Sequence, residues 1–177
     1  MPKLYQSVVI NAPIDKVWAV IRDFNSLATW HQFIETSRIV DDLPGTCVGG
    51  TRVLLPTAKA KEPESPARYQ HEKLLLYSER DHYYFYQILQ TPLAVTDYSL
   101  TLGLLPITEN NTTLAYWSGE FAVAKKDLPP PMNSDEFWTM AISERVLLGG
   151  LKSLQEAFAT GEFKELPKIY PPPDSAG

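Results

Sequence analysis

The sequence predicts an α+β fold in which a curved antiparallel β-sheet of about seven strands wraps around a long C-terminal α-helix. Apolar residues recur at helical spacing over residues 133–160. Strand-like runs joined by short turns precede this helix, and such runs are typical of an antiparallel meander rather than a parallel sheet. The chain has 177 residues, 44% of them hydrophobic, which suits one domain with a sizeable core.

The N-terminal part predicts one strand followed by two short helices. Residues 3–11 are rich in Val and Ile, as expected of a strand. Pro13 then indicates a helix start, because proline is favoured at the first helical position. The first helix carries an apolar face made of Val17, Trp18, Ile21 and Phe24. We expect the second helix over residues 25–30.

The central part predicts six strands. The first two are expected at residues 34–40 and 51–55, with a turn at Leu43-Pro44-Gly45 between them. The loop 56–66 contains three prolines and has about the length at which loops tend to be functional. The four longer strands are expected at residues 68–78, 82–90, 96–106 and 111–124.

The C-terminal part predicts the long helix and a tail. Asn133 or Ser134 can cap the helix, and Gly161 ends it near residue 160. Gly149 and Gly150 lie in mid-helix, where they either permit close packing or leave space for a ligand. We expect a domain over residues 1–162 and an extended, mobile, Pro-rich tail over residues 163–177.

Composition argues against several classes of function. The net charge is −5 and Lys and Arg do not cluster, so we expect no nucleic-acid partner. Cys47 is the single cysteine, which excludes an intramolecular disulfide and a Cys-based zinc site, and the three His are scattered. No Gly-rich phosphate loop is present, and we expect neither metal nor cofactor. Without a targeting leader or an apolar run near ~18 residues, the expected compartment is the cytoplasm, with no integral membrane association.

Six short motifs follow one another along residues 3–160. They are Ala12-Pro13-x-x-x-Val17-Trp18, Asp23-Phe24, Trp30-His31, Glu72-Lys73-Leu74, Pro92-Leu93-x-Val95-x-Asp97-Tyr98 and Trp117-Ser118-Gly119-Glu120-Phe121. In this order they resemble the START-like superfamily, also called Bet v 1-like or SRPBCC, and within it the bacterial polyketide cyclase/dehydrase-type proteins. The resemblance implies a helix-grip fold with an apolar cavity between the sheet and the C-terminal helix.

The resemblance and strand alternation together select the residues expected to line this cavity. Alternation places Tyr98 and Leu100 on one apolar face of their strand, and the resemblance puts Glu72 and Trp117 on the inside. The full predicted ligand-binding set is Trp30, His31, Val53, Leu55, Glu72, Leu74, Tyr84, Tyr86, Ile88, Tyr98, Leu100, Trp117, Val146 and Gly150. The tyrosines either orient a ligand through their hydroxyls or only fill the core.

Two of these residues are candidates for acid–base chemistry. A Glu72 carboxylate inside an apolar cavity would have a raised pKa and would need a partner, whereas the alternative is a surface Glu beside Lys73. The unperturbed pKa of a histidine would suit proton transfer at His31, and the alternative is a hydrogen-bonded His that closes the helix-to-strand corner.

The leading prediction for function is the binding of a small hydrophobic or aromatic ligand in the cavity. An alternative is an enzyme of the polyketide cyclase, aromatase or dehydratase type that uses Glu72 or His31 as its acid or base. A third is an interaction module without a small ligand, in the form of a homodimer.

Overall fold

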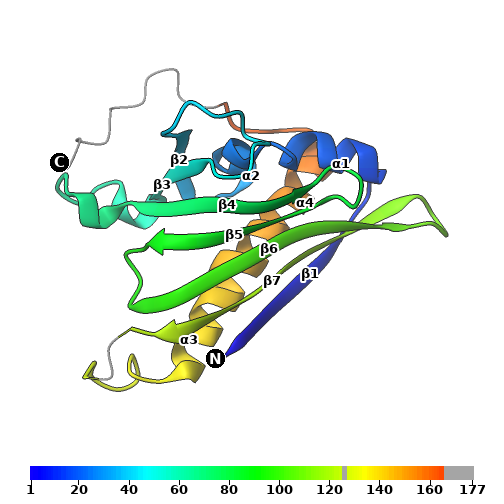
Figure 1. The fold of residues 1–177 in the computed structure, drawn as a ribbon. Helices are drawn as coiled ribbons and strands as arrows, with labels where there is room; N and C mark the ends of the chain where they lie inside the picture. Colours follow the sequence, from blue (N-terminus) through cyan, green and yellow to red (C-terminus); the bar gives the residue numbers. More distant parts are fainter. Residues whose placement is uncertain (125–126, 166–177) are drawn as a thin grey trace.

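A computed structural model describes residues 1–124 and 127–165 of the chain. Its sheet confirms the predicted fold class, with seven strands in the order β1-β7-β6-β5-β4-β3-β2 and every neighbouring pair antiparallel. Figure 1 shows the C-terminal helix crossing behind this sheet, so the sheet grips the helix from one side. The strand bounds are β1 Lys3–Ile10, β2 Ile34–Ile39, β3 Thr51–Pro56, β4 Gln70–Ser78, β5 Tyr83–Gln90, β6 Val95–Ile107 and β7 Thr112–Val123.

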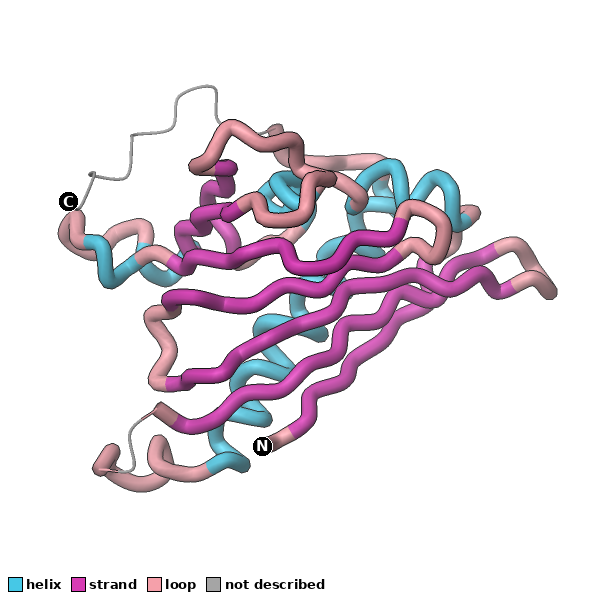
Figure 2. The backbone as a smooth tube through the Cα atoms, in the orientation of Figure 1, coloured by secondary structure: helices cyan, strands magenta, loops and turns pink. Residues whose placement is uncertain are grey.

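Two short helices follow β1, as predicted. They are α1 (Ile14–Ile21) and α2 (Leu27–Trp30), with a 3₁₀ turn, η1 (Phe24–Ser26), between them. Figure 2 shows both on the same side of the sheet as the C-terminal helix. The apolar face of α1 is buried, because Val17, Trp18 and Ile21 point into the core. These helices therefore close one end of the space between sheet and C-terminal helix.

The C-terminal helix runs without interruption through three segments. These are α3 (Asp135–Ala141), a π-helical segment η4 (Ile142–Leu148) and α4 (Gly149–Thr160). Ser134 caps its N-terminus, since the Ser134 hydroxyl accepts a hydrogen bond from the backbone N–H of Phe137 at 3.2 Å. Gly161 ends it with a φ of 75°, as the sequence predicts. The π-helical segment has no counterpart in the sequence-based expectation.

The core lies between the sheet and this helix. Leu102 of β6 faces it together with Leu151 and Leu154 of α4, and all three are fully buried. Residues 166–177, most of the predicted tail, lie outside the described residues. Lys164 belongs to the described start of the predicted tail, and it contacts the fold. Its backbone N–H donates to Thr29 O at 2.8 Å and its ammonium donates to His31 O at 3.1 Å.

Candidate functional site

The structure buries every predicted ligand-binding residue except Val146, which is half-buried. Glu72 is 2% exposed and Tyr98 1%, so neither side chain points to bulk solvent. Burial of the Glu72 carboxylate is costly unless another group neutralises or hydrogen-bonds it. The partners of these two polar side chains therefore decide what the interior can do.

Arg52 is the partner of Glu72. The two residues face each other across β3 and β4, and both Arg52 Nε and Arg52 Nη2 lie 2.6 Å from Glu72 Oε2. Arg52 Nη1 also donates to the backbone carbonyl of Phe24, and the guanidinium lies 3.8 Å from the centre of the Phe24 ring. Glu72 is thus half of a buried ion pair that joins β3 to β4. Through Arg52 the pair is also connected to Phe24 in η1.

Strand β3 presents a different face to the interior than we expected. Arg52 contacts Glu72, and Leu54 belongs to the same apolar core as the inner residues of the other strands. Val53 and Leu55 are also buried, but they lie outside that core because successive strand residues point to opposite faces. The structure therefore places Val53 and Leu55 away from the inner face and puts Arg52 and Leu54 there instead.

A chain of hydrogen bonds leads from this ion pair to the end of β5. Gln70 Nε2 donates to Glu72 Oε1 at 2.6 Å, and the Thr91 hydroxyl donates to Gln70 Oε1 at 2.8 Å. Both carboxylate oxygens of Glu72 are therefore engaged by protein donors. The carboxylate is held in one orientation, with no oxygen left without a protein partner.

The inner tyrosines differ in how their hydroxyls are satisfied. Tyr86 accepts a hydrogen bond from Trp117 Nε1 at 2.9 Å, whereas the buried Tyr98 hydroxyl has no hydrogen-bond partner among the described residues. Burial, with a smaller effect from the charge of Glu72, raises the pKa of Tyr98 well above its ordinary value. Tyr98 is therefore a neutral, unpaired hydroxyl on the inner face of β6.

His31 is held as a neutral structural group. Its Nε2 donates to Val146 O in η4 at 2.9 Å, and its Nδ1 accepts from the Phe33 backbone N–H at 3.2 Å. Burial lowers the pKa of His31 to about 4, with smaller effects from Lys164 and Arg52. Both ring nitrogens are occupied, which fits a hydrogen-bonded His at the corner between α2 and β2.

Acidification should destabilise the protein through His31. Because the pKa of His31 is about 4 when folded and near 6.5 when unfolded, the unfolded chain binds the proton first as pH falls. This contribution to stability is complete above ~pH 6.5 and is lost as the pH falls towards 4. Between about pH 7 and about pH 5 the loss is about 2 kcal/mol. Urea unfolding at the two pH values measures it.

The matched variant for this measurement is His31→Gln, which keeps a donor near Val146 but does not titrate. We expect its unfolding free energy to change less between the two pH values than that of the natural protein. His82→Gln serves as control and should keep the full pH dependence. Equal pH dependence in His31→Gln and the natural protein would contradict the assignment.

The glycine pair in the helix permits close packing. A Cβ atom on Gly150 would lie 2.5 Å from His31 Nε2 and 2.9 Å from Trp117 Cζ3. The rings of Trp30, His31 and Trp117 pack together here, with centroids 5.9 Å apart in each pair. The sequence leaves open whether the glycines permit close packing or leave space for a ligand. At Gly150 the structure shows close packing, because protein side chains occupy the space beside it.

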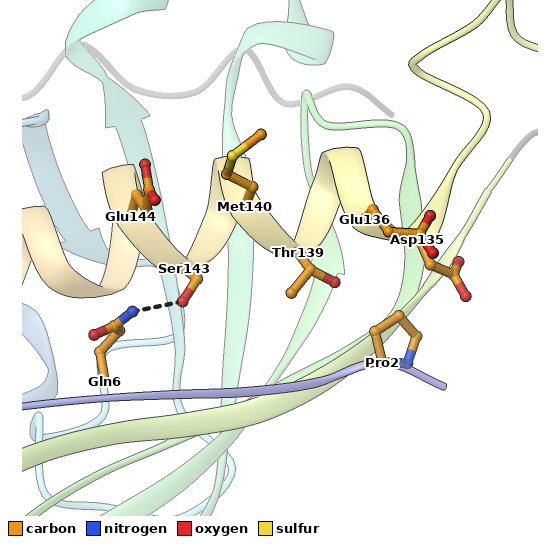
Figure 3. A pocket seen from close by; sticks show the side chains of 8 residues that line it. All are labelled: Pro2, Gln6, Asp135, Glu136, Thr139, Met140, Ser143 and Glu144. Atoms are coloured by element: carbon orange, nitrogen blue, oxygen red, sulfur yellow. Dashed lines mark hydrogen bonds between the residues drawn. The ribbon is translucent and has the colours of Figure 1, made fainter.

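The described part of the chain contains several open pockets, and three of them lie at different positions around the fold. One of about 480 Å³ separates β1 from α3 and η4, where Gln6 Nε2 donates to the Ser143 hydroxyl (Figure 3). Another of about 560 Å³ lies between α2 and α4 and is lined by Trp30. The third, of about 370 Å³, lies between the ends of β5 and β6. Neither Glu72, Tyr86 nor Trp117 lines any of these three.

The third pocket, named here the β5–β6 pocket, is the one that Tyr98 lines. Pairing of the two strands ends at Gln87 and Ser99, and β6 contains a bulge at this point, with Asp97 at a φ of 49°. The strands therefore separate towards the 91–94 connection. The lining residues are Gln87, Ile88, Leu89, Gln90, Thr91, Val95, Thr96, Asp97 and Tyr98.

The profile of a protein family described as polyketide cyclase / dehydrase and lipid transport matches residues 1–159. The chain belongs to this family. Its match covers all seven strands and nearly the whole C-terminal helix. The resemblance drawn from the sequence motifs is therefore confirmed at the level of the family.

Solved structures share the family fold. An uncharacterized protein from Bacillus thuringiensis is 29% identical, with a TM-score of 0.71 over 89% of this chain and 99% of that one. The protein XoxI from Bacillus cereus is 28% identical, with a TM-score of 0.66 over 90% and 96% of the two chains. A Nitrosospira multiformis protein is 26% identical, with a TM-score of 0.67 over 89% and 96%. No curated protein matches the chain.

Two groups in this member of the polyketide cyclase/dehydrase family were missed by sequence reasoning. Arg52 was not selected, although an inward carboxylate at Glu72 needs a cation and the neighbouring strand carries an Arg. Val146 O was expected only as part of a lining residue, not as the acceptor for His31. Among residues 1–124 and 127–165, no helix is both long and apolar enough to cross a bilayer.

Proposed function

We propose that this protein binds a small, largely apolar molecule whose polar group reaches the Tyr98 hydroxyl through the β5–β6 pocket. The observation that carries the proposal is the buried Tyr98 hydroxyl without a protein partner, because such groups need a ligand or water to offset their desolvation. Ile88 and Val95 supply apolar contacts beside it. A pocket of about 370 Å³ falls within the size range of small-molecule sites.

An acid–base enzyme has less support from the same geometry. His31 uses both ring nitrogens on backbone partners, and Glu72 uses both oxygens on Arg52 and Gln70. A general acid or base needs a proton-exchanging atom within reach of the substrate. Binding, rather than turnover, is therefore the proposed activity.

Native mass spectrometry of the protein purified from its own host tests the proposal directly. We expect a population that carries the added mass of one small molecule. A Thr96→Trp variant should lose this population, because Thr96 is an exposed residue at the pocket and a large ring there obstructs it. Lys3→Trp, on the exposed end of β1, is the control and should retain it. Retention by Thr96→Trp would place the molecule elsewhere.

Two conservative substitutions should change stability in opposite directions. Tyr98→Phe removes an unpaired buried hydroxyl, and we expect the free energy of unfolding to rise by about 1 kcal/mol. Tyr86→Phe removes the acceptor of Trp117 Nε1, and we expect a fall of about 1–3 kcal/mol. Urea unfolding of the ligand-free proteins measures both. A destabilised Tyr98→Phe would mean that its hydroxyl already has a partner in the free protein.

A further inference from the structure

Every charged group described on the inner face already has a partner in the protein. Arg52 donates from Nε to Glu72 and from Nη1 to Phe24 O, and one face of its guanidinium lies on the Phe24 ring. Arg52 Nη2 lies 2.6 Å from the same Glu72 oxygen as an ion pair, without a hydrogen bond of its own within the described residues. Glu72 Oε1 is taken by Gln70. An incoming anion would have to displace Glu72 from Arg52 and leave that carboxylate buried without a counter-ion.

The β5–β6 pocket offers no cation either. Asp97 is the one charged residue among the described residues that line it, and its carboxylate is exposed beside the opening. Arg68 lies in the neighbouring loop, which Gln90 holds by donating from Nε2 to Pro66 O at 2.7 Å. Two nitrogens of the Arg68 guanidinium are occupied there: Nη1 donates to the carbonyls of Ala60 and Glu62, and Nη2 contacts Glu64 and Tyr69. Its Nε is buried without a hydrogen-bond partner in the described part of the chain, and Arg68 does not line the pocket.

The pocket offers a ligand apolar surface and neutral polar side chains, and among these the Tyr98 hydroxyl is the one that is buried without a hydrogen-bond partner among the described residues. Tyr98 can donate to a ligand oxygen or accept from a ligand hydroxyl, and it carries no charge in either role. A ketone, ester or alcohol oxygen satisfies this hydroxyl without bringing a charge out of water. An ionised carboxylate meets the same donor but remains a buried charge without a cation.

We infer that the ligand of this pocket is an uncharged, oxygen-bearing apolar molecule, and that the site discriminates against the corresponding carboxylate. The inference rests on the proposed function, which supplies the ligand site. It adds the charge class that the site selects.

A set of probes that differ only in the polar group tests this inference. Methyl heptyl ketone, nonyl alcohol and sodium nonanoate share one chain length, and the acid is ionised at about pH 8. Amide shifts of the ¹⁵N-labelled full chain, followed as each probe is added, give the dissociation constants and the residues affected. We expect the ketone and the alcohol to bind at least about tenfold more tightly than nonanoate, with shifts centred on Ile88, Val95 and Tyr98.

Tyrosine variants identify the group responsible. Tyr98→Phe should weaken ketone binding by about three- to tenfold, which is the loss of one hydrogen bond. Tyr83 lies on the face of β5 opposite to that of Ile88 and does not line the pocket. The Tyr83→Phe variant should therefore bind the ketone as the natural protein does. Nonanoate binding as tightly as the ketone would overturn the charge selectivity and leave the binding function standing. Absence of pocket shifts with all three probes would overturn both.

Discussion

Replacing Arg52 by alanine should lower the free energy of unfolding by about 3–5 kcal/mol, the largest effect expected of any single change described here. The substitution removes the cation from the Glu72 carboxylate, which is 2% exposed in the natural protein. It also removes the guanidinium from the Phe24 ring and from Phe24 O, which loosens the end of the α1 region. Urea unfolding at neutral pH measures the loss.

A double variant separates the charge from the packing. Arg52→Met with Glu72→Leu removes both charges and keeps much of the side-chain volume, so we expect it to be more stable than Arg52→Ala. Arg22→Ala is the control, because the Arg22–Glu79 pair is about half exposed and screened by solvent, so its loss should cost far less stability. If Arg52→Ala lost no more stability than Arg22→Ala, the buried pair would not have the assigned role.

Gly150→Val should destabilise the protein by about 3 kcal/mol through overpacking. The new side chain would meet the rings of His31 and Trp117, which are both buried and cannot move aside. Gly149→Val is the matched change one residue earlier, where the obstacle is the Phe33 ring at 2.8 Å. Phe33 is 45% exposed and can rotate into solvent, so this variant should lose no more than about 1 kcal/mol.

Thermal or urea unfolding of the two valine variants makes the comparison. A near-ultraviolet circular dichroism spectrum adds a second readout. Displacement of Trp117 and its neighbour Trp30 should change the tryptophan bands for Gly150→Val, whereas Gly149→Val moves Phe33 and should leave those bands in place. Equal losses at the two positions would mean that the helix does not press against His31 as closely as the structure indicates.

Local patterns were sufficient to predict most of the fold. Alternation along β6 correctly assigned Tyr98 and Leu100 to the buried face, because each strand there has one apolar side. The prolines and glycines also marked the turns well, and Gly161 ends the helix as expected. These signals lie within a few residues of one another, so a single sequence contains them.

The candidate site depended on information that local patterns do not contain. Strand β3 is buried on both sides, so alternation could not show that Arg52 and Leu54, rather than Val53 and Leu55, face inward. His31 meets Val146 across a separation of 115 residues. The segment Ile142–Leu148 forms a π-helix, but its composition does not distinguish it from an α-helix. Each of these facts is tertiary and requires coordinates.

The pairing of Arg52 with Glu72 has a consequence for how the far edge of the sheet assembles. If β3 slipped by a single residue along β4, every β3 side chain would change sides, and Val53 or Thr51, depending on the direction, would meet the Glu72 carboxylate. Because both sides of β3 are apolar enough to be buried, hydrophobicity alone would penalise that misalignment only weakly. The attraction between the opposite charges therefore selects one register of β3 on β4.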